Sequence, residues 1–151
     1  SADKLSNWAL KEYERLQQEA PPIGGASIAL FNQKFDKNTQ AIPDVAEDKS
    51  VAIEFVGPRN CNLKNFSVAN ITIPAGASVK KHYHILSEES YQITKGSGIM
   101  HIDGEEKLIS AGQAVAIKPG QWHSICNDTN LDLVMCVTCS PPWTMEDQIF
   151  E

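Results

Sequence analysis

The chain has 151 residues, of which 42% are apolar, and this is enough for one domain with its own core. No apolar run approaches the roughly 20 residues that a membrane span requires, so we expect no membrane partner. The formal net charge is −6, without a stripe of basic residues, which argues against nucleic acid as a partner.

The N-terminal segment is predicted to form an amphipathic helix over about residues 4–19. Apolar side chains recur there with approximately helical spacing at Leu5, Trp8, Tyr13 and Leu16. A Pro-Pro pair at residues 21–22 ends the helix. The segment is charged and lacks the apolar stretch of a secretory signal, although a signal already removed would leave no trace. We therefore expect a helical arm, residues 1–24, followed by a β-rich domain, residues 25–151.

After this arm the sequence has the pattern of strands and turns that is typical of a β-protein. Short runs rich in branched residues alternate with Gly, Pro, Asn and Asp. The predicted strands are residues 27–31, 51–56, 65–73, 79–84, 90–94, 98–103, 107–109, 114–117, 123–126 and 131–139. Asp103-Gly104 between two strands is a strong hairpin signal. Residues 36–49 are polar and poorly periodic, which predicts a loop or a β-arm. Many short strands at regular intervals indicate a sandwich or barrel.

Two of the four cysteines, Cys136 and Cys139, have the spacing of a redox or zinc pair. They lie within the predicted strand 131–139, where residues three apart face opposite sides. We therefore interpret them as free thiols rather than as a functional pair. Free thiols are typical of the reducing cytoplasm, where we expect this protein to reside.

The candidate functional residues are three of the four histidines and one carboxylate: His82, His84, Glu89 and His123. Residues two apart on a strand point to the same face, so His82 and His84 present two imidazoles side by side. A carboxylate and a third imidazole complete a ligand set suited to a divalent transition metal. Glu88 is a rival for the carboxylate, but strand parity places Glu89 and Tyr91 on one face and leaves Glu88 outside.

The two segments that contain these residues resemble the two motifs of the cupin superfamily. Residues 76–96 match the pattern G-x5-HxH-x3,4-E-x6-G, and this spacing before the final glycine selects Glu89. Residues 112–127 match G-x5-PxG-x2-H-x3-N except at Lys118, where the motif has proline. Pro119, next to it, can still fix the backbone of that turn. The resemblance implies an all-β fold, a double-stranded β-helix or jelly-roll barrel, preceded here by the N-terminal amphipathic helix.

The resemblance also implies one divalent metal ion, bound by His82, His84, Glu89 and His123. The ligand types suit Fe, Mn, Ni, Co, Cu or Zn and do not select one of them. Tyr91 follows Glu89 by two residues and should point into the same cavity, where its phenol is a candidate acid/base. The alternative for Tyr91 is a buried core tyrosine with a satisfied hydroxyl.

Two other residues are interpreted structurally. His101 lies on a strand face opposite the apolar Met100 and Ile102, so we expect it at the surface or at a subunit interface. Asn127 most simply caps a turn by bonding to its own backbone.

Small cupins include dioxygenases, isomerases, decarboxylases, cyclases and lyases, and neither fold nor ligand set separates these reactions. We favour an enzyme that acts on a small oxygen-rich or anionic metabolite at the metal. The alternative is a binding protein that holds a sugar, a metabolite or a metal without turnover. A transcriptional regulator is disfavoured, because no helix-turn-helix pattern precedes the barrel.

Most cupins form dimers, often by exchanging N-terminal strands. The predicted helix and the predicted strand at residues 27–31 make a homodimer plausible for this chain. A small-molecule substrate or ligand and a second copy of the chain are therefore the expected partners.

Overall fold

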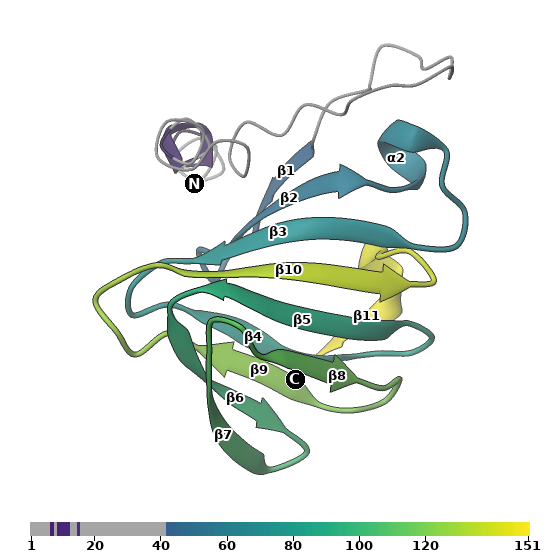
Figure 1. Cartoon of the computed structure of the whole chain (residues 1–151). Coiled ribbons are helices and arrows are strands. Elements are labelled where there is room, and N and C mark those ends of the chain that lie inside the picture. Colours follow the sequence, from purple (N-terminus) through teal and green to yellow (C-terminus); the bar gives the residue numbers. More distant parts are fainter. Residues whose placement is uncertain (1–6, 8, 13–14, 16–41) are drawn as a thin grey trace.

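The computed structural model describes residue 7, residues 9–12, residue 15 and residues 42–151. Two antiparallel sheets make up the fold, and in each of them strands that are distant in the sequence lie side by side (Figure 1). The fold is therefore all-β, as predicted. No helix in the described part of the chain is both long and apolar enough to cross a membrane.

The first sheet has the strand order β1-β2-β3-β10-β5-β8. Its strands are β1 (Ile42–Val45), β2 (Val51–Val56), β3 (Ser67–Ile73), β10 (Leu133–Ser140), β5 (Glu88–Lys95) and β8 (Ala114–Ile117). The second sheet has the order β11-β4-β9-β6-β7. Its strands are β11 (Gln148–Phe150), β4 (Ser78–His84), β9 (His123–Cys126), β6 (Ser97–Ile102) and β7 (Glu105–Ser110). A short helix, α2 (Pro58–Cys61), follows β2, and a 3-10 turn, η1 (Met145–Asp147), precedes β11.

The hydrophobic core lies between the sheets and is concentrated at the end away from β1 and β2. Its buried members include Ile73, Ile93, Met100, Ile125 and Leu133. Each comes from a strand on which alternate residues point inward, which is the pattern expected of a sheet with one solvated face. This packing fixes β4, β5 and β9, the strands that carry the candidate metal ligands.

Tight turns connect the strands at the positions expected from the sequence. Asp103 and Gly104 both have positive φ, at 47° and 81°, and join β6 to β7, as the hairpin signal predicts. Gly96 has φ of 80°, and a Cβ there would lie 2.6 Å from the carbonyl oxygen of Asp132. Both the conformation and the close approach require glycine at this motif position.

The predicted strands 51–56, 114–117 and 123–126 match β2, β8 and β9. The segment expected to be a loop or a β-arm contains β1, which pairs with β2. Sequence patterns did not predict α2, η1 or β11. The predicted strand at residues 27–31 lies outside the described residues, as does most of the N-terminal helix. The described residues of that helix, 7, 9–12 and 15, are helical, and Arg15 forms ion pairs with Glu12 and with Asp132 before β10.

Candidate metal centre

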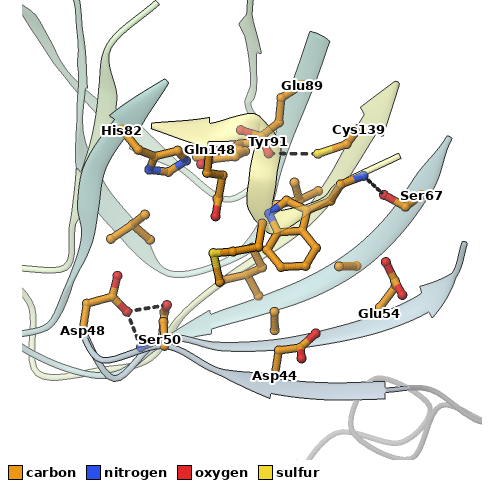
Figure 2. A pocket seen from close by; sticks show the side chains of 18 of the residues that line it. Asp44, Asp48, Ser50, Glu54, Ser67, His82, Glu89, Tyr91, Cys139 and Gln148 are labelled. Carbon is orange, nitrogen blue, oxygen red and sulfur yellow. Dashed lines mark hydrogen bonds between the residues drawn. The ribbon is translucent and has the colours of Figure 1, made fainter. Parts of the chain in front are cut away.

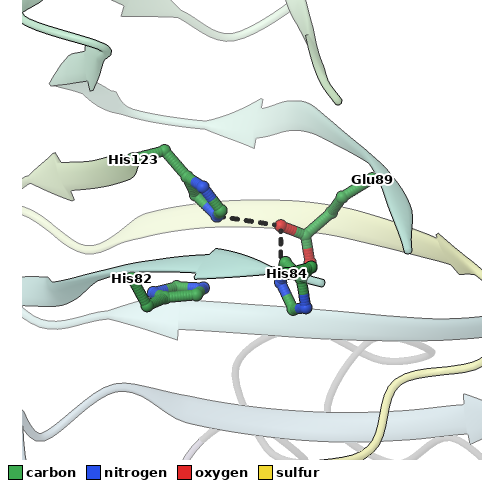
Figure 3. A group of neighbouring side chains, drawn as sticks. All are labelled: His82, His84, Glu89 and His123. Carbon is green, nitrogen blue, oxygen red and sulfur yellow. Dashed lines mark ion pairs between the residues drawn. The ribbon is translucent and has the colours of Figure 1, made fainter. Parts of the chain in front are cut away.

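Three neighbouring strands bring the four predicted ligands together (Figure 3). His82 and His84 lie on β4, His123 lies on β9, and Glu89 reaches them from β5 in the other sheet. The register of β4 and β9 pairs His82 directly with His123. One potential ligand atom from each residue lies within 4.8 Å of the others, so the four side chains could hold a metal ion.

The buried atoms of this cluster are arranged to bind a cation rather than to form hydrogen bonds with one another. His84, Glu89 and His123 are each nearly inaccessible to solvent. Glu89 Oε1 lies 3.2 Å from His123 Nε2 and 3.4 Å from His84 Nε2, yet within the described chain these three atoms have no hydrogen-bond partner. Leaving buried polar atoms unpaired costs about 1–3 kcal/mol each. A shared divalent cation would satisfy all three.

The outer nitrogen of each imidazole faces an oxygen atom. His82 Nδ1 lies 2.7 Å from the carbonyl of Lys80, and His123 Nδ1 lies 2.9 Å from the carbonyl of Gln121. These carbonyls can only accept, so each Nδ1 carries the proton and donates it. Each Nε2 is then a lone-pair donor directed into the cluster. This orientation by an outer hydrogen bond is typical of metal-binding histidines.

His84 differs from the other two because a carboxylate faces its outer nitrogen. Asp147 Oδ2 lies 3.5 Å from His84 Nδ1. The same carboxylate accepts hydrogen bonds from the backbone N–H groups of Leu86 and Ser87, at 2.8 and 3.1 Å. Asp147 therefore joins the C-terminal segment to the turn after β4 and places a carboxylate opposite His84 Nδ1.

These environments shift the pKa values of the two β4 histidines in opposite directions. Burial, and secondly the neighbouring His123, lower the pKa of His82 to about 4. Burial also acts to lower the pKa of His84, but the carboxylates of Glu89 and Asp147 outweigh it and raise the value. For Glu89, burial acts to raise the pKa, and the nearby His123 and His84 overcome this and lower it. The lowered pKa favours the ionised form of Glu89, which is the form that binds a cation.

The second oxygen of Glu89 is held by a thiol that the sequence analysis treated as structural. Cys139 Sγ donates to Glu89 Oε2 at 3.0 Å, because the register of β10 and β5 places Cys139 opposite Glu89. Burial, and then the charge of Glu89, raise the pKa of Cys139, so the thiol keeps its proton and remains a donor.

Tyr91, also buried, lies two residues along β5, with its ring 5.9 Å from that of His123. Burial and the charge of Glu89 raise its pKa as well.

A cavity of about 260 Å³ opens beside the cluster (Figure 2). His82, Glu89, Tyr91 and Cys139 line one end of it. The remaining wall comes mainly from β1, β2, β3 and the C-terminal segment. The cavity exists because several inward positions of that wall are small: Ala46, Ser50, Ala52, Ser67 and Ala69. It is large enough for a small metabolite.

The structure places other predicted residues as the strand patterns indicate. Glu88 is exposed while Glu89 is buried. His101 is on the surface, 3.6 Å from Glu106. Asn127 is fully buried, donates to the carbonyls of Ile73 and Leu131, and accepts from Thr129, so its interpretation as a turn cap is confirmed.

The sequence patterns did not predict that Asp147 and Cys139 lie beside the cluster. Asp147 lies outside both motifs, and no local pattern connects it to His84. Cys139 has a spacing that suggests a pair with Cys136, and nothing local connects it to Glu89. Both cysteines are free, and only Cys139 faces the cavity.

Comparison with known proteins identifies the family of this chain. Residues 69–139 match the family model of the cupin domain. An uncharacterised protein of Methanocaldococcus jannaschii is 31% identical over 121 residues, which cover 80% of this chain and 94% of that protein. The chain belongs to the cupin superfamily.

Two further similar proteins have a named ligand or activity. The oxalate-binding protein of Thermotoga maritima is 38% identical over 65 residues, covering 43% of this chain and 54% of that protein. A variant of Streptomyces Pac13, solved with uridine, superimposes with a TM-score of 0.62 at 13% identity and covers 80% of this chain and 92% of that one. Pac13 is described as a nucleoside dehydratase. At this identity the likeness shows the fold alone.

Proposed function

We propose that this cupin binds one divalent transition-metal ion through His82, His84, Glu89 and His123, and that it is an enzyme acting on a small oxygen-rich or anionic metabolite held at that ion. The observation that carries the proposal is the convergence of buried nitrogen and oxygen atoms that lack partners in the described chain. A bound cation would supply Lewis-acid chemistry by polarising an oxygen atom of the ligand.

The protein groups around the cluster have distinct parts in this proposal. Lys80, Gln121 and Asp147 orient the imidazoles from outside, and the Cys139 thiol holds Glu89 from behind. Tyr91 keeps its phenolic proton and lines the cavity, so it is the candidate to donate that proton to a ligand. Lyase, isomerase, cyclase and dioxygenase reactions are all compatible with this set of groups.

The second candidate is a binding protein without turnover, which the similarity to an oxalate-binding protein favours. Elemental analysis of the full chain, purified without chelators or affinity tags, tests what the two candidates share. We expect about one equivalent of one of Fe, Mn, Ni, Co, Cu or Zn. Failure of the protein to bind any of these six metals stoichiometrically, after reconstitution, would overturn the metal centre.

Turnover separates the two candidates. The metal-loaded protein would be incubated with a panel of small metabolites, and substrate and product would be followed by mass spectrometry. An enzyme converts at least one compound, and Tyr91→Phe should lower the rate while leaving metal content intact. Retention of a compound without chemical change would favour the binding protein.

We also propose that the chain is a cytoplasmic homodimer, in line with other cupins and with the free cysteines of the described chain. Deletion of residues 1–22 should lower both the thermal stability and the molecular mass in solution if this segment crosses between subunits. An unchanged elution volume on size exclusion would contradict that role.

A further inference from the structure

The cavity beside the metal cluster has a second end whose charge is opposite to that of a loaded metal site. A divalent cation with Glu89 as its one charged ligand would leave a net positive charge at the cluster. The other charged residues that line the cavity are three carboxylates and one guanidinium, from Asp44, Asp48, Glu54 and Arg59. They come from β1, β2, α2 and the turn between the first two. Figure 2 shows the three carboxylates along one side of the cavity. This far wall is therefore acidic.

Arg59 does not turn the far wall into an anion receptor. Its Nε donates to Glu54 Oε2 at 2.8 Å, and an Nη donates to Asp44 Oδ2 at 2.7 Å. Two carboxylates thus share one guanidinium. The pKa of Arg59 is raised mainly by its hydrogen bond to Asp44. An incoming anion would have to compete with both carboxylates for a cation that they already hold.

Asp48 has no such cation in its hydrogen bonds. Oδ1 accepts from the backbone N–H and the hydroxyl of Ser50, at 2.9 and 2.6 Å, and Oδ2 accepts from the backbone N–H of Lys80 at 2.9 Å. These are neutral dipoles, which fix the carboxylate in place without cancelling its charge. The ammonium of Lys80 lies instead over the ring of Phe150, 5.2 Å from its centroid. Asp48 therefore presents a fixed negative charge to the cavity.

Much of the remaining lining of the cavity is apolar. Ala52, Ala69 and Ile71 contribute to it from β2 and β3, and Trp143 and Phe150 contribute from the C-terminal segment. At the metal end, Glu89 Oε1 is buried and lacks a hydrogen-bond partner in the described chain. The cavity thus exposes buried metal-ligating atoms and a fixed carboxylate at different parts of its lining, together with several apolar side chains (Figure 2).

We propose that the natural ligand of this cavity has oxygen donors at the metal end, an apolar body, and a positively charged group at the Asp48 end. This inference rests on the proposed metal centre and deepens it. It narrows the ligand class, because a ligand long enough to span the cavity with a negatively charged tail would place that charge against the far wall. The cavity thus disfavours long dianions of the adipate type.

Matched probes with one carboxylate and three different tails test this inference on the Co(II)-loaded full chain. The set with a four-methylene spacer is 5-aminopentanoate, hexanoate and adipate, whose tails are an ammonium, a methyl and a carboxylate. Sets one and two methylenes shorter cover the unknown span. Binding is followed through the visible absorption of Co(II). We expect the ammonium tail to bind tightest and the carboxylate tail weakest, with about a 10-fold or larger difference at the best spacer length.

Asp48→Asn assigns the preference to one residue. This variant should reduce the preference for the ammonium over the methyl tail to near unity. Glu105→Gln is the matched control, since Glu105 is exposed on β7 and the charge change is the same; it should leave the preference as in the parent chain.

The possible failures are distinguishable. Failure of the chain to bind Co(II) or any of the other five metals stoichiometrically would overturn the metal centre and this inference with it. A normal Co(II) band together with tightest binding of the carboxylate tail, or with no binding of any probe at millimolar concentration, would overturn the ligand class alone. An ammonium preference that survives in Asp48→Asn would overturn the role of Asp48.

Discussion

The two ends of the cavity differ in how they are built. At the metal end, four side chains from two short sequence motifs lie on β4, β5 and β9 and converge within 4.8 Å. At the far wall, the charged residues come from β1, β2, α2 and the turn after β1, outside the residues that match the family model. Because the metal end matches the superfamily pattern and the far wall does not, we expect the first to set the type of chemistry and the second to select the ligand.

Removing one ligand at the metal end should have the largest effect on metal affinity. His123→Ala should lower metal affinity by more than about 100-fold, since losing even an outer partner of a ligand typically costs 10–100-fold. Isothermal titration or competition with a chromophoric chelator measures this. His101→Ala is the matched control, because His101 is a surface histidine outside the cluster. Equal affinity of the two variants would contradict the assignment of His123.

A smaller effect is expected from the carboxylate behind His84. Asp147→Asn should lower metal affinity by about 10–100-fold, because the amide removes the negative charge facing His84 Nδ1 while nearly keeping the side-chain volume. Nitrogen-15 NMR of the imidazole should show less of the Nδ1-protonated form of His84. Glu146→Gln, an exposed neighbour, is the control. A parent-like tautomer and affinity in Asp147→Asn would show that Asp147 only holds the turn at Leu86 and Ser87.

Acidification should weaken metal binding through His84 rather than through His82. The pKa of His82 is lowered to about 4, so this ligand is already neutral between pH 5 and 7. The pKa of His84 is raised, so the metal-free protein holds a proton there that a cation must displace. Affinity should therefore fall by about 10-fold per pH unit below the pKa of His84, and level off above it.

The raised pKa of His84 also determines how the stability of the metal-free protein changes with pH. The contribution of protonated His84 is fully present below the unfolded pKa and is lost as pH rises through the raised folded value. Calorimetry in buffers of different ionisation enthalpy counts the protons released on metal binding. Asp147→Asn should shift the pH midpoint of this proton release to lower pH, because Asp147 helps to raise the pKa of His84. An affinity that stays flat between pH 5 and 7 would contradict the account.

The difference between the two ends also explains what the sequence could predict. His82, His84 and Glu89 lie close together in the sequence, on the consecutive strands β4 and β5, so period-2 alternation and motif spacing located them. Cys139 contacts Glu89 only because β10 pairs with β5 in one register, and strand register is not encoded in a local pattern. Asp48 and Asp44 lie in the polar segment that was expected to be a loop or a β-arm, where no periodicity indicated an inward face.

The smallest effect on the metal is expected from a change in the apolar lining of the cavity. Ala69→Leu adds an apolar side chain to the cavity from β3, while Val68→Leu adds bulk one residue earlier, where the chain faces away from the cavity. Neither should change metal affinity, because neither position contacts the cluster. Only Ala69→Leu should weaken binding of the tailed carboxylates, by several-fold, because it fills space that the apolar body of the ligand needs. If Ala69→Leu weakened Co(II) binding as much as probe binding, the metal cluster and the cavity lining would be coupled, and the lining would not be an independent determinant of ligand choice.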